Sequence, residues 1–118
     1  MAGTPYKSGP AFLAAAAANI FTVPANTYAK ITHIHLVNKN AAARIVNLYV
    51  GATGGSASGT EELAGHSIAA SGSTTADDFY DLYYPAGLKL IASDFLTGFC
   101  TADATSVIIT VTYDLYAV

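Results

Sequence analysis

Hydrophobic and polar side chains alternate along much of the chain with a period of two residues. The longest case is residues 107–116, where the odd positions are large and apolar or aromatic and the even ones include Thr110, Thr112 and Asp114. A period of two is that of a β-strand with one buried face. Because this segment is long and rich in β-branched residues, we predict that it forms a central strand.

Further short segments of β-forming residues are separated by clusters of Gly, Pro, Asn and Asp. They are residues 20–23, 28–37, 44–50, 63–69, 79–84, 88–91 and 95–101. Residues 28–37 and 44–50 are expected to pair as a hairpin. About eight strands at such spacings predict an all-β fold, an antiparallel β-sandwich, and leave jelly-roll and immunoglobulin-like topologies open.

The chain of 118 residues has the length of one domain. Residues 1–10 are rich in Gly, Thr, Pro and Ser without periodicity, so we expect an extended N-terminal arm followed by a single sandwich domain over residues 11–118. The alanine run 14–18 is expected to lead, extended, into the first strand, with one helical turn as the alternative. Residues 51–60, with four glycines, predict a flexible loop.

Composition excludes several classes of function. Only 11% of residues are charged and the formal net charge is -3, whereas nucleic-acid binding needs clustered Lys and Arg. No apolar run approaches the ~20 residues of a membrane span. Residues 7–19 imitate a signal peptide, but Gly9 and Pro10 interrupt them and we expect no cleaved leader. The single cysteine, Cys100, permits no internal disulfide.

His33 and His35 are the strongest candidates for metal ligands, since residues two apart on a strand project from the same face. Zinc takes at least one further protein ligand. The other candidates are His66 and carboxylates with no recognisable spacing. The sequence therefore favours the alternative that both imidazoles lie on a solvent-facing or subunit-facing side of the sheet, and predicts no metal or cofactor.

Catalytic chemistry is not indicated either. Cys100 lies in an apolar segment, where a thiol usually behaves as a small buried hydrophobe. Residues 65–67, Gly-His-Ser, lack the surroundings of a nucleophile elbow. The acidic pairs at 61–62 and 77–78 follow no calcium-loop pattern. We expect a protein that is not an enzyme.

The densest aromatic cluster is Phe79-Tyr80-Asp81-Leu82-Tyr83-Tyr84. On a strand, positions 80, 82 and 84 share one face and positions 79, 81 and 83 share the other. Tyrosine is enriched at interfaces because its ring buries area while its hydroxyl finds a partner. One face is therefore a candidate contact with a neighbouring subunit or a sugar, and the alternative is one core face and one ordinary exposed face.

From about residue 20 to residue 116 the order of segments resembles small β-sandwich structural proteins of tailed bacteriophage virions. The matching segments are FTVPANTYAKITHIHLVNKN, AAARIVNLYVG, GLKLIASDFLTGF and the terminal Val/Ile/Thr strand. The resemblance implies a non-enzymatic capsid decoration (cement) protein that binds and stabilises the outer shell of a phage head. A tail or baseplate component is the alternative within the virion, and a carbohydrate-binding module is the alternative from another class.

The same resemblance implies partners and a location. The partners are the major capsid protein or other virion subunits and further copies of the chain, with a trimer favoured; the location is the virion, after synthesis in the host cytoplasm. The residues expected at such interfaces are Tyr6, Lys7, Phe12, His33, His35, Tyr80, Tyr83 and Tyr84.

Overall fold

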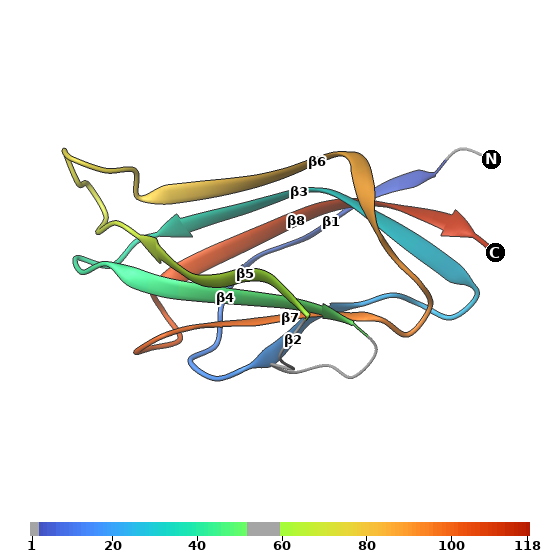
Figure 1. The fold of residues 1–118 in the computed structure, drawn as a ribbon, viewed down its shortest axis with the longest axis horizontal. Coiled ribbons are helices and arrows are strands. Elements are labelled where there is room, and N and C mark those ends of the chain that lie inside the picture. Colours follow the sequence, from blue (N-terminus) through green and yellow to red (C-terminus); the bar gives the residue numbers. More distant parts are fainter. Residues whose placement is uncertain (1–2, 52–59) are drawn as a thin grey trace.

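The computed structural model describes residues 3–51 and 60–118, and these residues form a sandwich of two four-stranded antiparallel sheets (Figure 1). The strands are β1 (Thr4–Phe12), β2 (Ala18–Thr22), β3 (Thr27–Asn38), β4 (Arg44–Gly51), β5 (Glu61–Ile68), β6 (Phe79–Leu90), β7 (Phe95–Cys100) and β8 (Val107–Ala117). The predicted all-β sandwich is confirmed. The loop predicted over residues 51–60 lies, apart from its two ends, outside the described residues.

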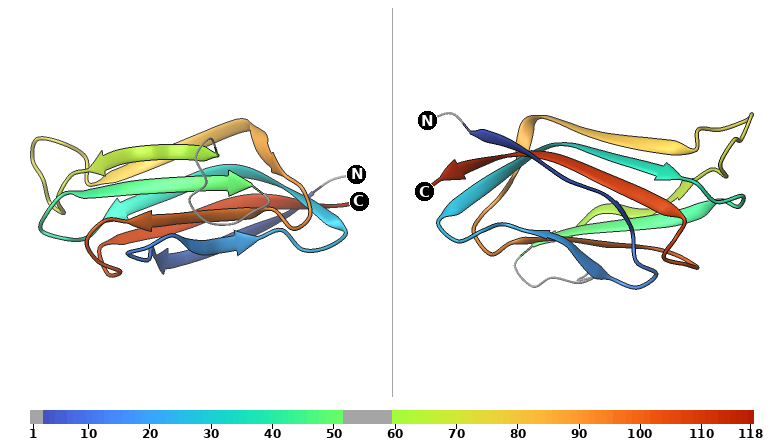
Figure 2. Two further views of the ribbon diagram at one scale, coloured as in Figure 1. Left: turned by 60° about the horizontal axis from the view of Figure 1, so that its bottom comes forward. Right: turned by 180° about the vertical axis from the view of Figure 1, so that it is seen from behind.

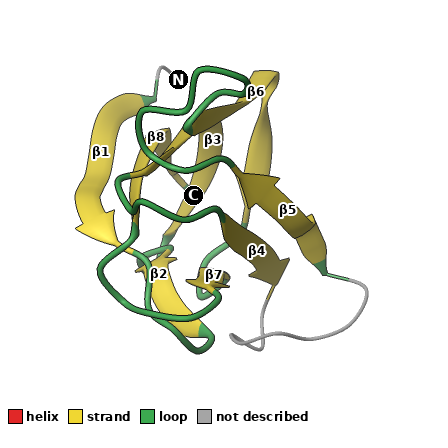
Figure 3. Ribbon diagram, turned by 90° about the vertical axis from the view of Figure 1, so that its left-hand side faces the viewer, coloured by secondary structure: helices red, strands yellow, loops and turns green. Residues whose placement is uncertain are grey.

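Strand order decides between the two topologies that the sequence left open. The first sheet has the order β1-β8-β3-β6 and the second has the order β2-β7-β4-β5. Strands therefore pair as β1 with β8, β2 with β7, β3 with β6 and β4 with β5, which is one long hairpin rolled into two layers. This is the eight-stranded jelly roll with its two Greek keys. Figure 3 shows the two layers end-on.

The predicted hairpin between residues 28–37 and 44–50 is wrong. These residues fall in β3 of the first sheet and β4 of the second, and the connection between them crosses from one layer to the other. The partners of β3 are β6 and β8. The prediction that the last strand is central is confirmed, because β8 lies between β1 and β3.

Residues 88–91 were expected to form a strand of their own, but Leu88–Leu90 continue β6. The register jumps from His33↔Tyr83 to Ile31↔Leu88, so Pro85 and Gly87 lie in an irregular bend inside one strand. Gly87 has a φ of 82°, and a Cβ there would meet the Lys30 Cβ at 2.8 Å. The bend therefore needs glycine, since other residues rarely adopt this φ and have no room.

Most of the segment expected to be an extended N-terminal arm forms a strand of the sandwich. Thr4–Phe12 form β1, which pairs antiparallel with β8 from Thr4↔Leu115 to Phe12↔Ile108. Figure 2 shows β1 running along β8, and in Figure 1 the start of β1 and the end of β8 lie at the same end of the molecule. The register shifts between Ser8 and Ala11, around Gly9 and Pro10. An edge strand can accept this interruption because one side of it has no strand to pair with.

The core lies between the two sheets and consists of apolar side chains from both inner faces. Its buried members are Leu13, Phe21, Val23, Ala29, Ile31, Ile34, Leu36, Val46, Leu48, Ile68, Leu90, Leu96, Cys100, Val107, Ile109 and Val111. No described segment is helical, so the alanine run at 14–18 enters β2 without a helical turn. Among the described residues there is accordingly no helix long and apolar enough to cross a membrane.

Candidate interaction surface

An apolar row crosses the outer face of the first sheet, from one edge strand to the other. The register pairs Phe12 with Ile108, Ile108 with Val37 and Val37 with Phe79, so the four side chains lie side by side on β1, β8, β3 and β6. Phe12 is 47% exposed and Phe79 is 43% exposed. We call these four residues the apolar row. Next to it, the Nζ of Lys39 lies 5.4 Å from the centre of the Phe12 ring.

A histidine–aspartate cluster, made of His33, His35 and Asp81, lies beside the apolar row. His33 and His35 project from β3, and Asp81 on β6 is the Cα partner of His35. The Asp81 Oδ1 lies 2.7 Å from His33 Nε2 and 2.6 Å from His35 Nδ1. Partial burial raises the pKa of the Asp81 carboxyl, but the hydrogen bonds from His35 and His33 outweigh burial and hold this pKa below its ordinary value.

Aromatic rings flank this cluster on the same face. The Tyr83 ring stacks on the His33 ring, with centroids 4.6 Å apart and planes 10° apart. The centroid of Phe79 lies 6.2 Å from that of His35. Tyr83 is 70% exposed, so its ring covers His33 while its other side stays open to solvent. The prediction that residues 79, 81 and 83 share one face is therefore confirmed.

Of the eight predicted interface residues, five lie on this outer face: Lys7, Phe12, His33, His35 and Tyr83. Lys7 pairs with Thr112, which in turn pairs with His33. Tyr6 stacks on Tyr113, with ring centroids 5.8 Å apart. The structure thus gathers on one surface residues that the sequence separates by up to 76 positions, from Lys7 to Tyr83.

Tyr80 and Tyr84 point the other way, toward the core between the sheets. The Tyr84 hydroxyl donates a hydrogen bond of 2.8 Å to Glu62 Oε1 on β5. Burial first, and the Glu62 carboxylate second, raise the pKa of Tyr84 above its ordinary value. Tyr84 therefore links β6 to β5, the neighbouring edges of the two sheets.

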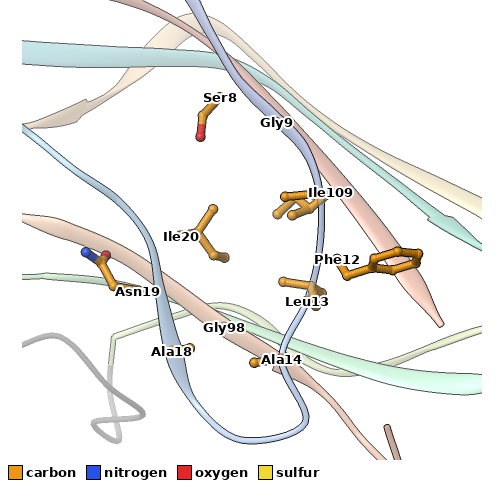
Figure 4. Close-up of a pocket in the computed structure, with 11 residues that line it drawn as sticks. Ser8, Gly9, Phe12, Leu13, Ala14, Ala18, Asn19, Ile20, Gly98 and Ile109 are labelled. Carbon is orange, nitrogen blue, oxygen red and sulfur yellow. The ribbon is translucent and has the colours of Figure 1, made fainter. Parts of the chain in front are cut away.

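A small cavity lies between β1 and β2 at the other edge of the sandwich (Figure 4). It has a volume of about 130 Å³ and is lined largely by apolar and small residues, among them Leu13, Ala14, Ile20 and Gly98. The residues that line it include no titratable side chain. The cavity therefore has no group suited to acid–base chemistry.

A second hollow, of about 440 Å³, lies where β5 ends and β6 begins. His66, Asp77, Phe79 and Tyr80 contribute to its lining, and the His66 and Tyr80 rings stack with centroids 3.9 Å apart. An aromatic ring beside polar donors and acceptors is the kind of surface that can bind a sugar.

Three other side chains weighed for catalysis or metal binding, those of Cys100, Asp78 and His66, lie within strands or bond to the backbone. Cys100 is fully buried in β7, as expected, and burial raises the pKa of its thiol. In the acidic pair at 77–78, Asp78 accepts a hydrogen bond of 3.1 Å from the Gly72 N–H. His66, in the Gly-His-Ser segment, lies within strand β5.

The third member of the histidine–aspartate cluster was missed by sequence reasoning. Asp81 lies 46 residues after His35, in a segment whose aromatic residues indicate an interface rather than a metal site. The alternation of residues 79–84 could have placed Asp81 on an outer face. Only the pairing of β3 with β6 sets it opposite His35.

The chain was compared with protein families, with curated proteins and with solved structures. No family model matches the chain, and no curated protein matches it. Among solved structures, a pentameric capsid protein isolated from metagenomic phage sequences is similar to this chain, with a TM-score of 0.40 and 13% sequence identity. The similarity covers 93% of this chain and 59% of that protein. The jelly-roll topology is assigned from the strand order of the chain itself.

Proposed function

We propose that this chain is a structural protein of a tailed-phage virion, and more specifically a capsid decoration protein that binds the outer shell of the head. The sequence resembles such proteins from about residue 20 to residue 116. The jelly-roll topology is one that viral capsid domains use. Because many functions share this fold, the proposal depends on the surface of this chain and not on its topology alone.

The observation that carries the proposal is the apolar row. Its four side chains form a continuous stripe across the first sheet, and the two aromatic rings at its ends are nearly half exposed. A contiguous exposed apolar surface indicates a contact with another molecule, whereas scattered apolar residues do not. With only 11% charged residues, the chain is suited to lasting contacts between subunits.

The proposed contact uses the face of the first sheet, of which β1 is a part. β1 is hydrogen-bonded to β8 along Thr4–Phe12, so residues 4–12 reach a neighbour only as part of the sheet. Phe12, at the end of β1, contributes its ring to the apolar row. We therefore place the capsid shell against the apolar row, with further copies of the chain, three in the state that the resemblance implies, arranged around each site.

Substitutions on the two outer faces test this placement. Phe79→Ser and Phe12→Ser each remove one ring from the apolar row. Ile45→Ser is the matched control, because Ile45 is 42% exposed on the second sheet and loses a comparable apolar side chain. Heads assembled without the protein are incubated with each purified variant and pelleted, and the bound fraction is measured over a range of concentrations.

The expected result is at least a tenfold weaker binding for Phe79→Ser and Phe12→Ser, with Ile45→Ser close to the unsubstituted protein. A tenfold change corresponds to about 1.4 kcal/mol, which is reasonable for one aromatic side chain in an interface. Undiminished binding of both phenylalanine variants would show that the apolar row is not the contact surface.

A carbohydrate-binding role is the second candidate, favoured by the hollow beside His66 and Tyr80. In that case a glycan array gives reproducible hits that Tyr80→Ala abolishes, while Phe12→Ser leaves them unchanged. The tail or baseplate alternative is separated from both by the position of the chain in imaged particles.

A further inference from the structure

Three potential metal ligands meet on the outer face of the first sheet. His33 Nε2, His35 Nδ1 and Asp81 Oδ1 all lie within 4.8 Å of one another. Two of these atoms come from β3 and the third from β6, so both strands hold the set in place. Among the described residues, no other group of three or more His, Cys, Asp or Glu side chains brings its ligand atoms this close together.

We propose that His33, His35 and Asp81 bind one divalent transition-metal ion, of the class of Zn²⁺. Two imidazole nitrogens and one carboxylate oxygen suit Zn²⁺ and its first-row neighbours, whereas Ca²⁺ and Mg²⁺ prefer oxygen ligands alone. A site with three protein ligands leaves a position for water or for a donor from another molecule. The inference does not depend on the proposed role in the virion.

The distances fit this proposal after a small adjustment of side chains. Ligands that sit about 2.0–2.1 Å from one tetrahedral ion are about 3.3 Å from each other. The two N···O distances of 2.7 Å and 2.6 Å must therefore widen by about 0.7 Å, which side-chain rotation can supply. Each ligating nitrogen then presents its lone pair to the ion, and the proton of that neutral ring resides on the other ring nitrogen.

The surroundings of the cluster support access and orientation. The side chains of His33, His35 and Asp81 are 30%, 41% and 19% exposed, so an ion can reach them from solvent. The stacked Tyr83 ring restricts rotation of the His33 imidazole. Such contacts around the ligands hold them in the orientation that binding needs.

The alternative is a hydrogen-bonded link between β3 and the edge strand β6 that binds no ion. Both alternatives use the same atoms, so the shape of the apo protein does not separate them. Stoichiometric binding of an ion does. A bound ion would also stabilise the native state, because the unfolded chain does not hold the three ligands together.

The experiment uses the full chain without a histidine tag, stripped with a chelator and titrated with Zn²⁺ by calorimetry. Parallel titration with Co²⁺ gives a visible spectrum that reports the ligand set. We expect one ion per chain and a higher Tm with Zn²⁺ than without it. His33→Ala, His35→Ala and Asp81→Asn should each weaken binding at least tenfold, because each alanine removes one of the three ligands and the asparagine replaces a charged oxygen ligand with a weaker neutral one.

His66→Ala is the control, since His66 lies on β5 and stacks on Tyr80. It should bind Zn²⁺ as the unsubstituted chain does. Circular dichroism confirms that each variant is folded. Absence of stoichiometric binding, or binding that persists unchanged in all three cluster variants, would overturn the proposal.

Discussion

Asn38 offers a sharp test of how the two sheets are joined. It is fully buried at the end of β3. Its Nδ2 donates to the carbonyl oxygens of Ala42 and Ala69 at 3.0 Å and of Ile68 at 3.3 Å, and its Oδ1 accepts from the Asn40 N–H at 2.9 Å. One amide thus connects the first sheet, the β3–β4 connection and the end of β5.

The cost of losing this amide follows from its bonds. The nitrogen carries two hydrogens, so two donated bonds and one accepted bond are counted. At about 0.5–1.5 kcal/mol each, Asn38→Ala should lower the free energy of unfolding by about 3 kcal/mol. Asn38→Asp keeps the shape but turns an oxygen toward carbonyl oxygens and buries a charge, so its cost should be at least as large.

Urea unfolding followed by circular dichroism measures both variants. With a slope of about 1.5 kcal/mol per molar urea, a loss of about 3 kcal/mol lowers the midpoint by about 2 M. Asn40→Asp is the control, because the Asn40 Oδ1 only accepts a bond from the Ala42 N–H and a carboxylate can do the same. If the free energy of unfolding of Asn38→Asp lies within about 0.5 kcal/mol of that of the unsubstituted chain, the amide does not join the sheets as described.

Three further predictions concern single positions. Gly98→Ala should lower the free energy of unfolding by about 1–3 kcal/mol in thermal unfolding, because its Cβ would lie 2.7 Å from the Asn47 carbonyl oxygen; an unchanged Tm would refute this close approach. Hydrogen bonds from the Ser106 hydroxyl and the Thr105 N–H, then from Arg44, lower the pKa of Asp103 to about 2. Its contribution to stability is therefore present above the ordinary value of about 3.9 and lost as pH falls toward 2, so Asp103→Asn should flatten the stability curve between about pH 4 and pH 2, and an equally steep curve would count against these bonds. Cys100 should react with a thiol reagent only after urea unfolds the chain, and fast labelling of the native protein would contradict its burial.

The existence of most strands could be predicted from the sequence, but their partners could not. Alternation along residues 107–116 reports only that one face is buried, and it does so whichever strands lie alongside. The expected hairpin between β3 and β4 failed for this reason. A short turn permits pairing, but here the connection crosses between the layers, where both strands bury apolar residues in the shared core.

β1 was missed because its sequence carries the marks of a loop. Gly9 and Pro10 interrupt it, and its side chains are mostly exposed on both faces, so no alternation is visible. Residues 4–12 form a strand because they pair with the edge of β8. The sequence of residues 4–12 alone does not contain this information. The same limit explains why residues 1–10 were expected to be an arm.

The surface was partly predictable. Alternation over residues 79–84 correctly separated the two faces, but both faces carry tyrosines, so the sequence could not say which one is buried. Tyr80 and Tyr84 were therefore included among interface residues although they pack against the core. Asp81 could not be joined to His33 and His35 without the cross-strand register.

The central proposal is that this chain works by attaching the outer face of its first sheet to a phage head. Cryo-electron microscopy of particles that carry the chain tests it most directly, at a resolution that separates the two sheets. The proposal predicts symmetric copies on the shell with Phe12 and Phe79 turned toward it. Copies found only on the tail, or copies on the shell with this face turned to solvent, would contradict it.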